Sequence, residues 1–476
     1  MRIHRLALLA GCAGLLAAPA AADDLREALA LAYVSNPTLQ AARAQQRAVD
    51  EGVPIARSAQ LPGVDADATY SEVLKSAVSN PLLPDRNLSA GVSLGMPVYA
   101  GGSIRNSIRA AKTRVEAGQA DLRAAESDVF ASVVAAYMDV ILAEKVVGLN
   151  RANARRLEVN LQATRDRFEI GDLTRTDVAQ SESRLALARG QTSSAEANLA
   201  AARERYIQIV GKEPVDLASP PELPGLPAAA DAATDTALEN NPDLIAARER
   251  AKAAGIDVRT VSAGRLPRVS VFAGADYADT LGTNKVVGAV QSSTSASAGV
   301  RMSVPLFQGG LPAAQRRQAQ AREGIAIEQE IAIERAVIAN TRAAFAQWQA
   351  AQQLTASSQS AVAAAELGLE GVRAENTVGN RTILDILNAE NELLGAQVQY
   401  ETARRNAYVA GFNLLAAMGK AEARDLGLDG GALYDPQTNY DRVKGQIFDW
   451  SDDPAPKAQS TRTVDTRVQD GSVKGQ

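Results

Sequence analysis

Two short segments place a glycine, a threonine and an aspartate in the same order, and these residue types suit a sharp chain reversal followed by a helix start. They are IGDLTRTD, at 170–177, and VGNRTILD, at 378–385. Glycine adopts positive φ angles without a steric penalty, so Gly171 and Gly379 predict turns that connect one helix to the next. The chain therefore makes the same helix-to-helix turn twice.

The threonine and the aspartate of each segment suit the first turn of the following helix. Thr174 and Thr382 are expected at helix starts, where a hydroxyl can cap free backbone N–H groups. Asp177 and Asp385 each follow their threonine by three positions. A carboxylate is favoured there by the helix dipole, so the simplest interpretation of each acid is a solvated helix-terminal charge.

The N-terminus has the features of a secretory signal peptide. Residues 1–22 read MRIHRLALLAGCAGLLAAPAAA, with a basic start, an apolar core and an alanine-rich cleavage site. Cleavage after Ala22 removes the only histidine, His4, and the only cysteine, Cys12. A lipoprotein-like box, LAGC, leaves lipidation of Cys12 as the alternative.

The mature chain then lacks the groups on which many enzymes depend. Without histidine or cysteine there is no Cys–His or Ser–His–Asp nucleophile system and no ordinary zinc site. No GxxxxGK(S/T) phosphate-binding loop occurs in the sequence, and the VGK and MGK segments merely end helices. We therefore expect a protein that is not an enzyme and that carries no metal or cofactor.

The composition is typical of long helices packed side by side. Of the 476 residues, 46% are hydrophobic and only 4% are aromatic, which does not suit a compact α/β enzyme. The formal net charge is −5, so nucleic acid is not an expected partner. No segment after the signal peptide has 18 consecutive apolar residues, so no transmembrane helix is predicted.

The two halves of the sequence resemble each other. SNPTLQAAR at 35–43 resembles NNPDLIAAR at 240–248, and MPVYAGG at 96–102 resembles VPLFQGG at 304–310. A proline-rich segment separates the halves. The predicted organisation is a signal peptide (1–22), a first repeat (23–212), a linker (213–230), a second repeat (231–424) and an equatorial or disordered tail (425–476).

Each repeat is expected to contain one very long helix beside two shorter ones. The stretch from Gly102 to Gly171 and the stretch from Gly310 to Gly379 are equally long, and each corresponds to roughly 100 Å of helix. Shorter helices over about 25–60 and 172–210 would lie end to end beside the first long helix. A seven-residue spacing indicates a coiled-coil seam, formed by Val133, Val140, Val147, Ala154, Leu161 and Phe168.

Four segments alternate apolar and polar residues with period two, which is typical of β-strands with one apolar face. They lie at 64–71, 88–98, 268–277 and 294–307. They form two pairs with loops at 72–87 and 279–292, and two solvent-exposed hairpins are the alternative. Four strands are too few to close a membrane barrel, so several copies of the chain would have to contribute.

These motifs, taken in order, resemble the TolC family of outer-membrane efflux and secretion channels. The resemblance spans about Asp24 to Met418 and includes both repeats. It implies a homotrimer, mainly α with a membrane β-barrel: an α-helical barrel in the periplasm continued by a 12-stranded β-barrel, with four strands from each protomer and two internal repeats. The implied partners are a periplasmic adaptor protein and an inner-membrane ABC or RND transporter, and the implied location is the outer membrane of a Gram-negative cell.

The resemblance also assigns a gate at the helix turns. The family motif VGTRTIVDVLDA carries two acids that project into the lumen; here the first is Asp385 and the second is replaced by Asn388. In a trimer each acid of the family motif forms a ring of three carboxylates, and the loss of the second ring is expected to weaken block of the channel by cations. Glu392, two turns beyond Asp385, is a candidate substitute for the lost acid. A solvated helix-terminal acid remains the alternative interpretation of Asp385.

Two further family features fall on these turns. Arg381 and Asp177 match members of a polar latch between neighbouring hairpins, whereas its aromatic member falls on Asn376. The adaptor-contact turns correspond to Gly171, Thr174, Gly379 and Thr382.

The implied function is an exit duct that passes efflux or type I secretion substrates from an inner-membrane pump to the outside. A passive porin and a soluble periplasmic coiled-coil adaptor are the alternatives. The tail segment YDPQTNYDRVKGQIFDW, at 434–450, also resembles members that serve type I secretion. Beyond Asp452 the polar composition predicts disorder.

Overall fold

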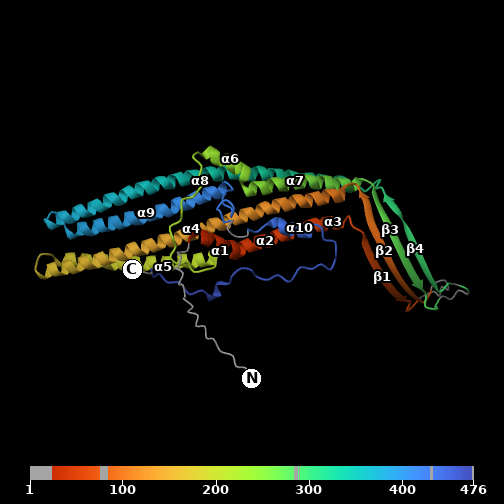
Figure 1. Ribbon diagram of the computed structural model, residues 1–476, viewed down its shortest axis with the longest axis horizontal. Coiled ribbons are helices and arrows are strands. Elements are labelled where there is room, and N and C mark those ends of the chain that lie inside the picture. Colours follow the sequence, from red (N-terminus) through yellow and green to blue (C-terminus); the bar gives the residue numbers. More distant parts are fainter. Residues whose placement is uncertain (1–23, 76–83, 284–287, 289, 429–432, 474–476) are drawn as a thin grey trace, which may run out of the picture.

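The computed structural model describes residues 24–75, 84–283, 288, 290–428 and 433–473. Helices run along the long axis of the molecule, and a single sheet extends from one end of them (Figure 1). The predicted signal peptide and Cys12 lie outside the described residues. No helix in the described part of the chain combines the length and the apolar character needed to cross a bilayer.

The helices follow the two halves of the sequence. In the first half they are α1 (Leu25–Ser35), α2 (Pro37–Asp50), α3 (Gly52–Ser58), α4 (Ser103–Glu169) and α5 (Arg175–Val210). In the second half they are α6 (Ala230–Asn240), α7 (Pro242–Ser262), α8 (Leu311–Thr377) and α9 (Ile383–Ala417). The tail adds α10 (Pro436–Val443), and 3₁₀ turns span Ala263–Arg265 and Thr463–Asp465.

The two long helices have the length and position that the sequence predicted. α4 and α8 contain 67 residues each, or about 100 Å of helix. Toward the tips α4 packs along α5, and toward the sheet it packs along α2 and α3; α8 packs in the same way along α9 and α7 (Figure 1). Each half is therefore one long helix beside a stack of shorter ones.

The seven-residue seam of α4 is buried over most of its length. Val133, Val140 and Val147 are fully buried, and Leu161 is only 6% exposed. Phe168 departs from the pattern, since 43% of it is exposed. The seam therefore ends before the helix does, because Phe168 lies next to the turn.

The helix predicted over about 25–60 is broken twice, which corrects that expectation. Asn36 separates α1 from α2 with an extended backbone, at φ −68° and ψ 124°. Pro37 causes this break, because proline disfavours a helical conformation in the residue before it. A second break falls at Glu51, and Asn241 repeats the first one between α6 and α7.

Asn36 and Asn241 also join helices end to end. The oxygen of the Asn36 side chain accepts two backbone N–H groups in the first turn of α2, while its Nδ2 donates to Ile209 O near the end of α5 (2.9 Å). Asn241 caps α7 in the same way, and its Nδ2 donates to Ala417 O at the end of α9 (3.0 Å). One side-chain amide thus satisfies free backbone N–H groups at a helix start and a free carbonyl near a helix end. This explains why the NP motif and the GK helix end occur together in both repeats.

Four antiparallel strands form one sheet in the order β1-β2-β3-β4. They are β1 (Gly63–Glu72), β2 (Arg86–Ala100), β3 (Arg268–Asp279) and β4 (Ser292–Ser303). Because β2 pairs with β3, the two predicted strand pairs merge across the repeats. β4 ends at Ser303, earlier than expected, since Pro305 lacks the N–H that a strand ladder needs. β1 and β4 are the two edges of the sheet.

The two faces of the sheet differ as the period-two alternation predicted. Val64, Leu94, Ala273 and Ala298 align across the four strands on one face. Asp67, Gly91, Asp276 and Ser295 align across them on the other. The apolar face is uncovered in the protomer, since Val64 is 64% exposed and Val300 is 69% exposed.

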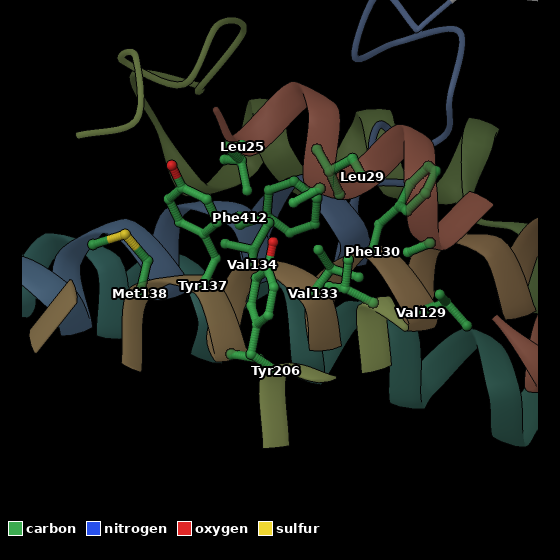
Figure 2. Packing of buried hydrophobic residues seen from close by; sticks show 14 of the residues in the cluster. Leu25, Leu29, Val129, Phe130, Val133, Val134, Tyr137, Met138, Tyr206 and Phe412 are labelled. Carbon is green, nitrogen blue, oxygen red and sulfur yellow. The ribbon is translucent and has the colours of Figure 1, made fainter. Parts of the chain in front are cut away.

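The main core lies where α1, the middle of α4 and the C-terminal parts of α5 and α9 meet (Figure 2). Phe130 and Tyr137 of α4 are fully buried, and Tyr206 of α5 and Phe412 of α9 are 1% exposed. Residues 213–229 of the predicted linker contain no helix or strand; Tyr137 OH donates to Ala218 O there at 2.6 Å. The core therefore ties the two repeats and the linker together through α4.

The chain beyond α10 runs back along the outside of the helices to α5 (Figure 1). The Arg442 guanidinium donates to both carboxylate oxygens of Asp453 at 2.8 and 2.9 Å. Farther on, Arg203 donates to Asp470 O at 3.0 Å and to Ser472 O at 2.8 Å. The described tail beyond Asp452, for which the composition predicted disorder, is irregular and hydrogen-bonded to arginine side chains of α5 and α10.

Candidate gate at the helix tips

Both helix hairpins, α4–α5 and α8–α9, end in the same turn. Gly171 and Gly379 have φ angles of +84° and +83°. In each turn the N–H of the glycine and that of the next residue donate to carbonyls three and five residues earlier, at 2.9–3.0 Å. This is a Schellman-type helix end, which favours glycine at the left-handed position. The two reversals lie where the sequence predicted them.

The threonine and the aspartate after each turn form a reciprocal capping box. Thr382 Oγ1 accepts from Asp385 N at 3.3 Å, while Asp385 Oδ2 accepts from Thr382 N at 2.9 Å and from its hydroxyl at 2.8 Å. Thr174 and Asp177 repeat this arrangement at 3.3, 2.9 and 2.7 Å. Each acid therefore has a structural role in starting its helix.

These hydrogen bonds also keep the two acids ionised. The Thr382 backbone N–H and then its hydroxyl hold the pKa of the Asp385 carboxyl below its usual range. The Thr174 hydroxyl and then its backbone N–H do the same for the pKa of Asp177. Because hydrogen bonding favours the charged form, both carboxylates carry a fixed negative charge near the tips at neutral pH.

Arg381 finds its partner inside its own hairpin. Its Nε donates to Glu375 Oε2 at 2.7 Å, and its carbonyl accepts from Asn376 Nδ2 at 2.7 Å. Asp177 caps a helix in the other hairpin. The protomer thus does not bring the two predicted latch residues into a hydrogen bond, and a link between Asp177 and Arg381 would have to join two copies of the chain.

Asn388, at the position of the missing second acid, links the two hairpins of one protomer. Its Oδ1 accepts from Arg184 Nη2 of α5 at 2.8 Å. Glu392 is exposed on α9. Glu392 follows Asp385 by seven positions on α9, so the two share a helix face, as the sequence predicted.

A third acid near the tips, Glu390, was missed by the sequence reasoning. Its side chain is only 1% exposed and accepts hydrogen bonds from Asn160 of α4 and Arg373 of α8. A signal was present in the sequence: Glu390 follows Ile386 and Leu387 and precedes Leu393 at helical spacing. A charge on such an apolar stripe requires a buried partner.

The described residues contain no group of three or more histidine, cysteine, aspartate or glutamate side chains arranged to hold a metal ion. The tips contain two glycine turns, two capped helix starts and several polar links between side chains. Such an arrangement can fix the position of carboxylates near the tips and can hold neighbouring helices together.

Comparison with known proteins identifies relatives along nearly the whole chain. The outer membrane efflux protein family model matches residues 28–212 and 233–420. The outer membrane efflux protein BepC of Brucella suis is 33% identical over 430 residues, which cover 90% of this chain and 92% of BepC. The outer membrane protein TolC of Escherichia coli is 28% identical over 469 residues, which cover 92% and 93% of the two chains.

Solved structures share the fold. The CmeC outer membrane channel of Campylobacter jejuni superimposes with a TM-score of 0.73 at 17% identity, covering 88% of this chain and 89% of CmeC. The two blocks matched by the family model coincide with the two structural repeats, and the gap between them contains the linker.

Proposed function

Because the chain belongs to the outer membrane efflux protein family, we propose that it is the outer-membrane exit duct of a tripartite export system. It passes efflux or secretion substrates through a periplasmic helical tunnel and an outer-membrane β-barrel to the outside. The observation that carries this function is the sheet with an uncovered apolar face at one end of helices about 100 Å long, with two hairpin tips at the other end.

The duct is a homotrimer. Its twelve strands close one barrel when β4 of each copy pairs with β1 of the next, which removes the open edges of the protomer. The helices support the same assembly: α4 buries 22 of its residues within the protomer, whereas α8 buries only six. The uncovered faces of α8 pack against a neighbouring copy in the proposed trimer.

The apolar face of the sheet contacts lipid, and the tips point into the periplasm. There Gly171, Thr174, Gly379 and Thr382 form the contact turns for an adaptor protein, and an inner-membrane pump of the ABC or RND class supplies the energy. Asp385, Asn388, Asp177 and Arg381 form the gate region. The duct itself does no catalysis.

Membrane fractionation and planar bilayers test this function together. We expect the mature protein in the outer-membrane fraction, as a trimer that forms pores of low conductance and co-purifies with an adaptor and a pump. Recovery as a soluble periplasmic monomer would favour the adaptor alternative. Wide pores that stay open without any partner would favour the passive porin.

A first prediction concerns the proposed latch. Arg381→Ser is expected to raise single-channel conductance, because it removes the cation that links neighbouring hairpins. The change should be modest, since exposed ion pairs contribute only about 0–1 kcal/mol. Glu375→Gln is the matched control, because it breaks the pair with Arg381 inside the hairpin and leaves the cation free for a neighbouring copy. An unchanged conductance in Arg381→Ser would remove Arg381 from the latch.

A second prediction concerns the lumen of the barrel. Asp67 and Asp276 lie on the polar face on either side of Gly91, so the lumen of the trimer carries six carboxylates at these positions. Replacing both with asparagine is expected to lower the cation-to-anion permeability ratio by about twofold or more. Asp279→Asn, at the end of β3 on the other face, should change this ratio less. Equal ratios in wild type and the double variant would contradict a lumenal position.

A further inference from the structure

The sheet meets the helices at a cavity whose lining combines apolar side chains with one cation. The cavity lies where β2 ends and α4 begins (Figure 1), and its volume is about 500 Å³. Among the described residues that line it, Arg105 is the only charged one, and the apolar lining includes Met96, Val98, Tyr99, Ile104 and Ile108. The cavity therefore offers room for an apolar group beside a positive charge.

The apolar lining continues the uncovered apolar face of the sheet. Met96 and Tyr99 of β2 pair with Val271 and Val269 of β3, and Val98 is the extra residue of a bulge between these pairs. The bulge brings Tyr99 onto the apolar face, where 49% of its surface is exposed. A tyrosine at the end of a lipid-facing strand is typical of the boundary between hydrocarbon and headgroups. The cavity thus lies at the level of that boundary.

Arg105 begins a row of cations on one face of α4. Arg109 and Lys112 follow it by four and seven positions, so the three side chains share a helix face, and all three are exposed. The row covers about 10 Å of helix, whereas the headgroup zone on each side of a bilayer is about 5–8 Å thick. Because long basic side chains reach along a surface toward the headgroups, the whole row can contact that zone.

Helix α7 adds a fourth cation at the same level. Lys252 of α7 lies 3.7 Å from Glu116 of α4, so the two helix faces adjoin. Arg259 follows Lys252 by seven positions toward the sheet and is exposed. Residues 96–115 and 258–268 contain no aspartate or glutamate. Within the part of the chain that the structure describes, none of the four cations forms an ion pair.

The opposite end of the sheet lacks this imbalance of charge. There Arg86 pairs with Glu72 at 3.1 Å, and Asp279 ends β3. The whole chain has a formal net charge of −5, so composition does not account for a group of unpaired cations at one level. Like charges repel one another, and a ligand with negative charge relieves that repulsion.

We propose that Arg105, Arg109, Lys112 and Arg259 form a basic collar that binds the phosphate groups of anionic phospholipids in the periplasmic leaflet of the outer membrane. One such lipid occupies the cavity, with its phosphate at Arg105 and an acyl chain against Val98 and Tyr99. A guanidinium group suits this role because its N–H groups match the geometry of phosphate oxygens. The inference rests on the proposed function, which supplies the lipid contact, and it adds a headgroup preference to it.

Native mass spectrometry of the detergent-solubilised trimer tests the collar with two lipids that differ in headgroup charge. Wild type should bind dioleoylphosphatidylglycerol about fivefold or more tightly than dioleoylphosphatidylcholine, because each basic side chain near the headgroups contributes about this factor. In the variant with Arg105→Gln, Arg109→Gln and Lys112→Gln, the two affinities should agree within about twofold. Salt at about 0.5 M should also reduce the wild-type preference, since it screens exposed charges.

The matched control removes three exposed arginines farther along α4 and α8, by Arg155→Gln, Arg335→Gln and Arg342→Gln. It loses the same charge and should keep the preference of wild type. Arg105→Gln alone changes an exposed side chain without an ion pair, so it tests the collar even if the triple variant fails to assemble; its preference should fall about twofold or more. Inorganic phosphate should displace the anionic lipid no better than chloride at equal ionic strength.

The outcomes separate the collar from the function on which it rests. If a trimeric wild type binds both lipids equally, or if the control loses the preference as the triple variant does, the collar is wrong and the exit duct stands. Displacement by inorganic phosphate but not by chloride would show a site for free phosphate and would also contradict the collar. Recovery of wild type as a soluble periplasmic monomer would overturn the duct and the collar together.

Discussion

Replacing Gly419 with alanine is expected to prevent assembly of the protein in the outer membrane. Gly419 ends α9 with a φ of +69°, which costs an alanine about 1–2 kcal/mol. A Cβ there would also lie 3.0 Å from Asn241 Cα and still closer to the carbonyl of Asn240. Backbone atoms cannot rotate away as a side chain can, so overpacking adds about 1–3 kcal/mol. The measurement is the yield of trimer in outer-membrane extracts.

The first repeat provides a matched comparison. Gly211 has the equivalent position and a φ of +86°, but a Cβ there would meet the side chains of Thr461 and Ser35. Since those hydroxyls can rotate, Gly211→Ala should reduce the yield much less. Gly324→Ala, in the interior of α8 with nothing within 4 Å, should be neutral or stabilise by up to about 1 kcal/mol. Similar yields for Gly419→Ala and Gly324→Ala would refute the argument from backbone contact.

Replacing Asp385 with asparagine is expected to weaken block of the channel by trivalent cations on the order of tenfold. Asparagine retains an oxygen that can accept from Thr382, so the capping box is largely kept while three charges leave the trimeric pore. The pKa of Asp385 is held below its usual range. Wild-type block should therefore persist as pH falls from neutral and be lost only when pH drops below that lowered pKa. Current through single trimers, titrated with the cation, gives the blocking constant.

Asp177→Asn is the matched control for this experiment. It makes the same change in an equivalent capping box, so any effect of weakening a cap appears in both variants. Only Asp385→Asn should lower the affinity for the cation if Asp385 faces the pore. If the trivalent cation blocks both variants as strongly as it blocks wild type, Asp385 only caps the helix. Glu392→Gln in the Asp385→Asn background then shows whether Glu392 supplies residual block.

Local sequence was sufficient for the repeated elements. Gly171 and Gly379 determine where each helix reverses, because their positive φ angles are costly for other residues. The capping threonines follow from the same local logic, and period-two alternation defined the strands and their two faces. The break at Pro37 was equally local but was not predicted, although proline disfavours a helical conformation in the residue before it.

Contacts between side chains of distant segments could not be predicted from local sequence. The sequence indicated only that Asn388 replaces an acid, whereas the fold shows that it accepts a hydrogen bond from Arg184. The role of Glu390 depends on Asn160, which is 230 positions away in the sequence. The tail beyond Asp452 has a composition typical of disorder, yet Arg203 binds its backbone. Such partners depend on which helix faces meet, and no short motif records that.

The sequence by itself determined the two repeats, the long helices, the tip turns and a sheet with one apolar face, because each follows from backbone preferences and from residue periodicity within one segment. Only the tertiary structure decided which acids cap a helix, which cross between hairpins and which backbone carbonyl lies against Gly419. The physical reason is that hydrogen bonds and ion pairs act over a few ångströms between side chains, and the chain brings those side chains together only when the helices pack.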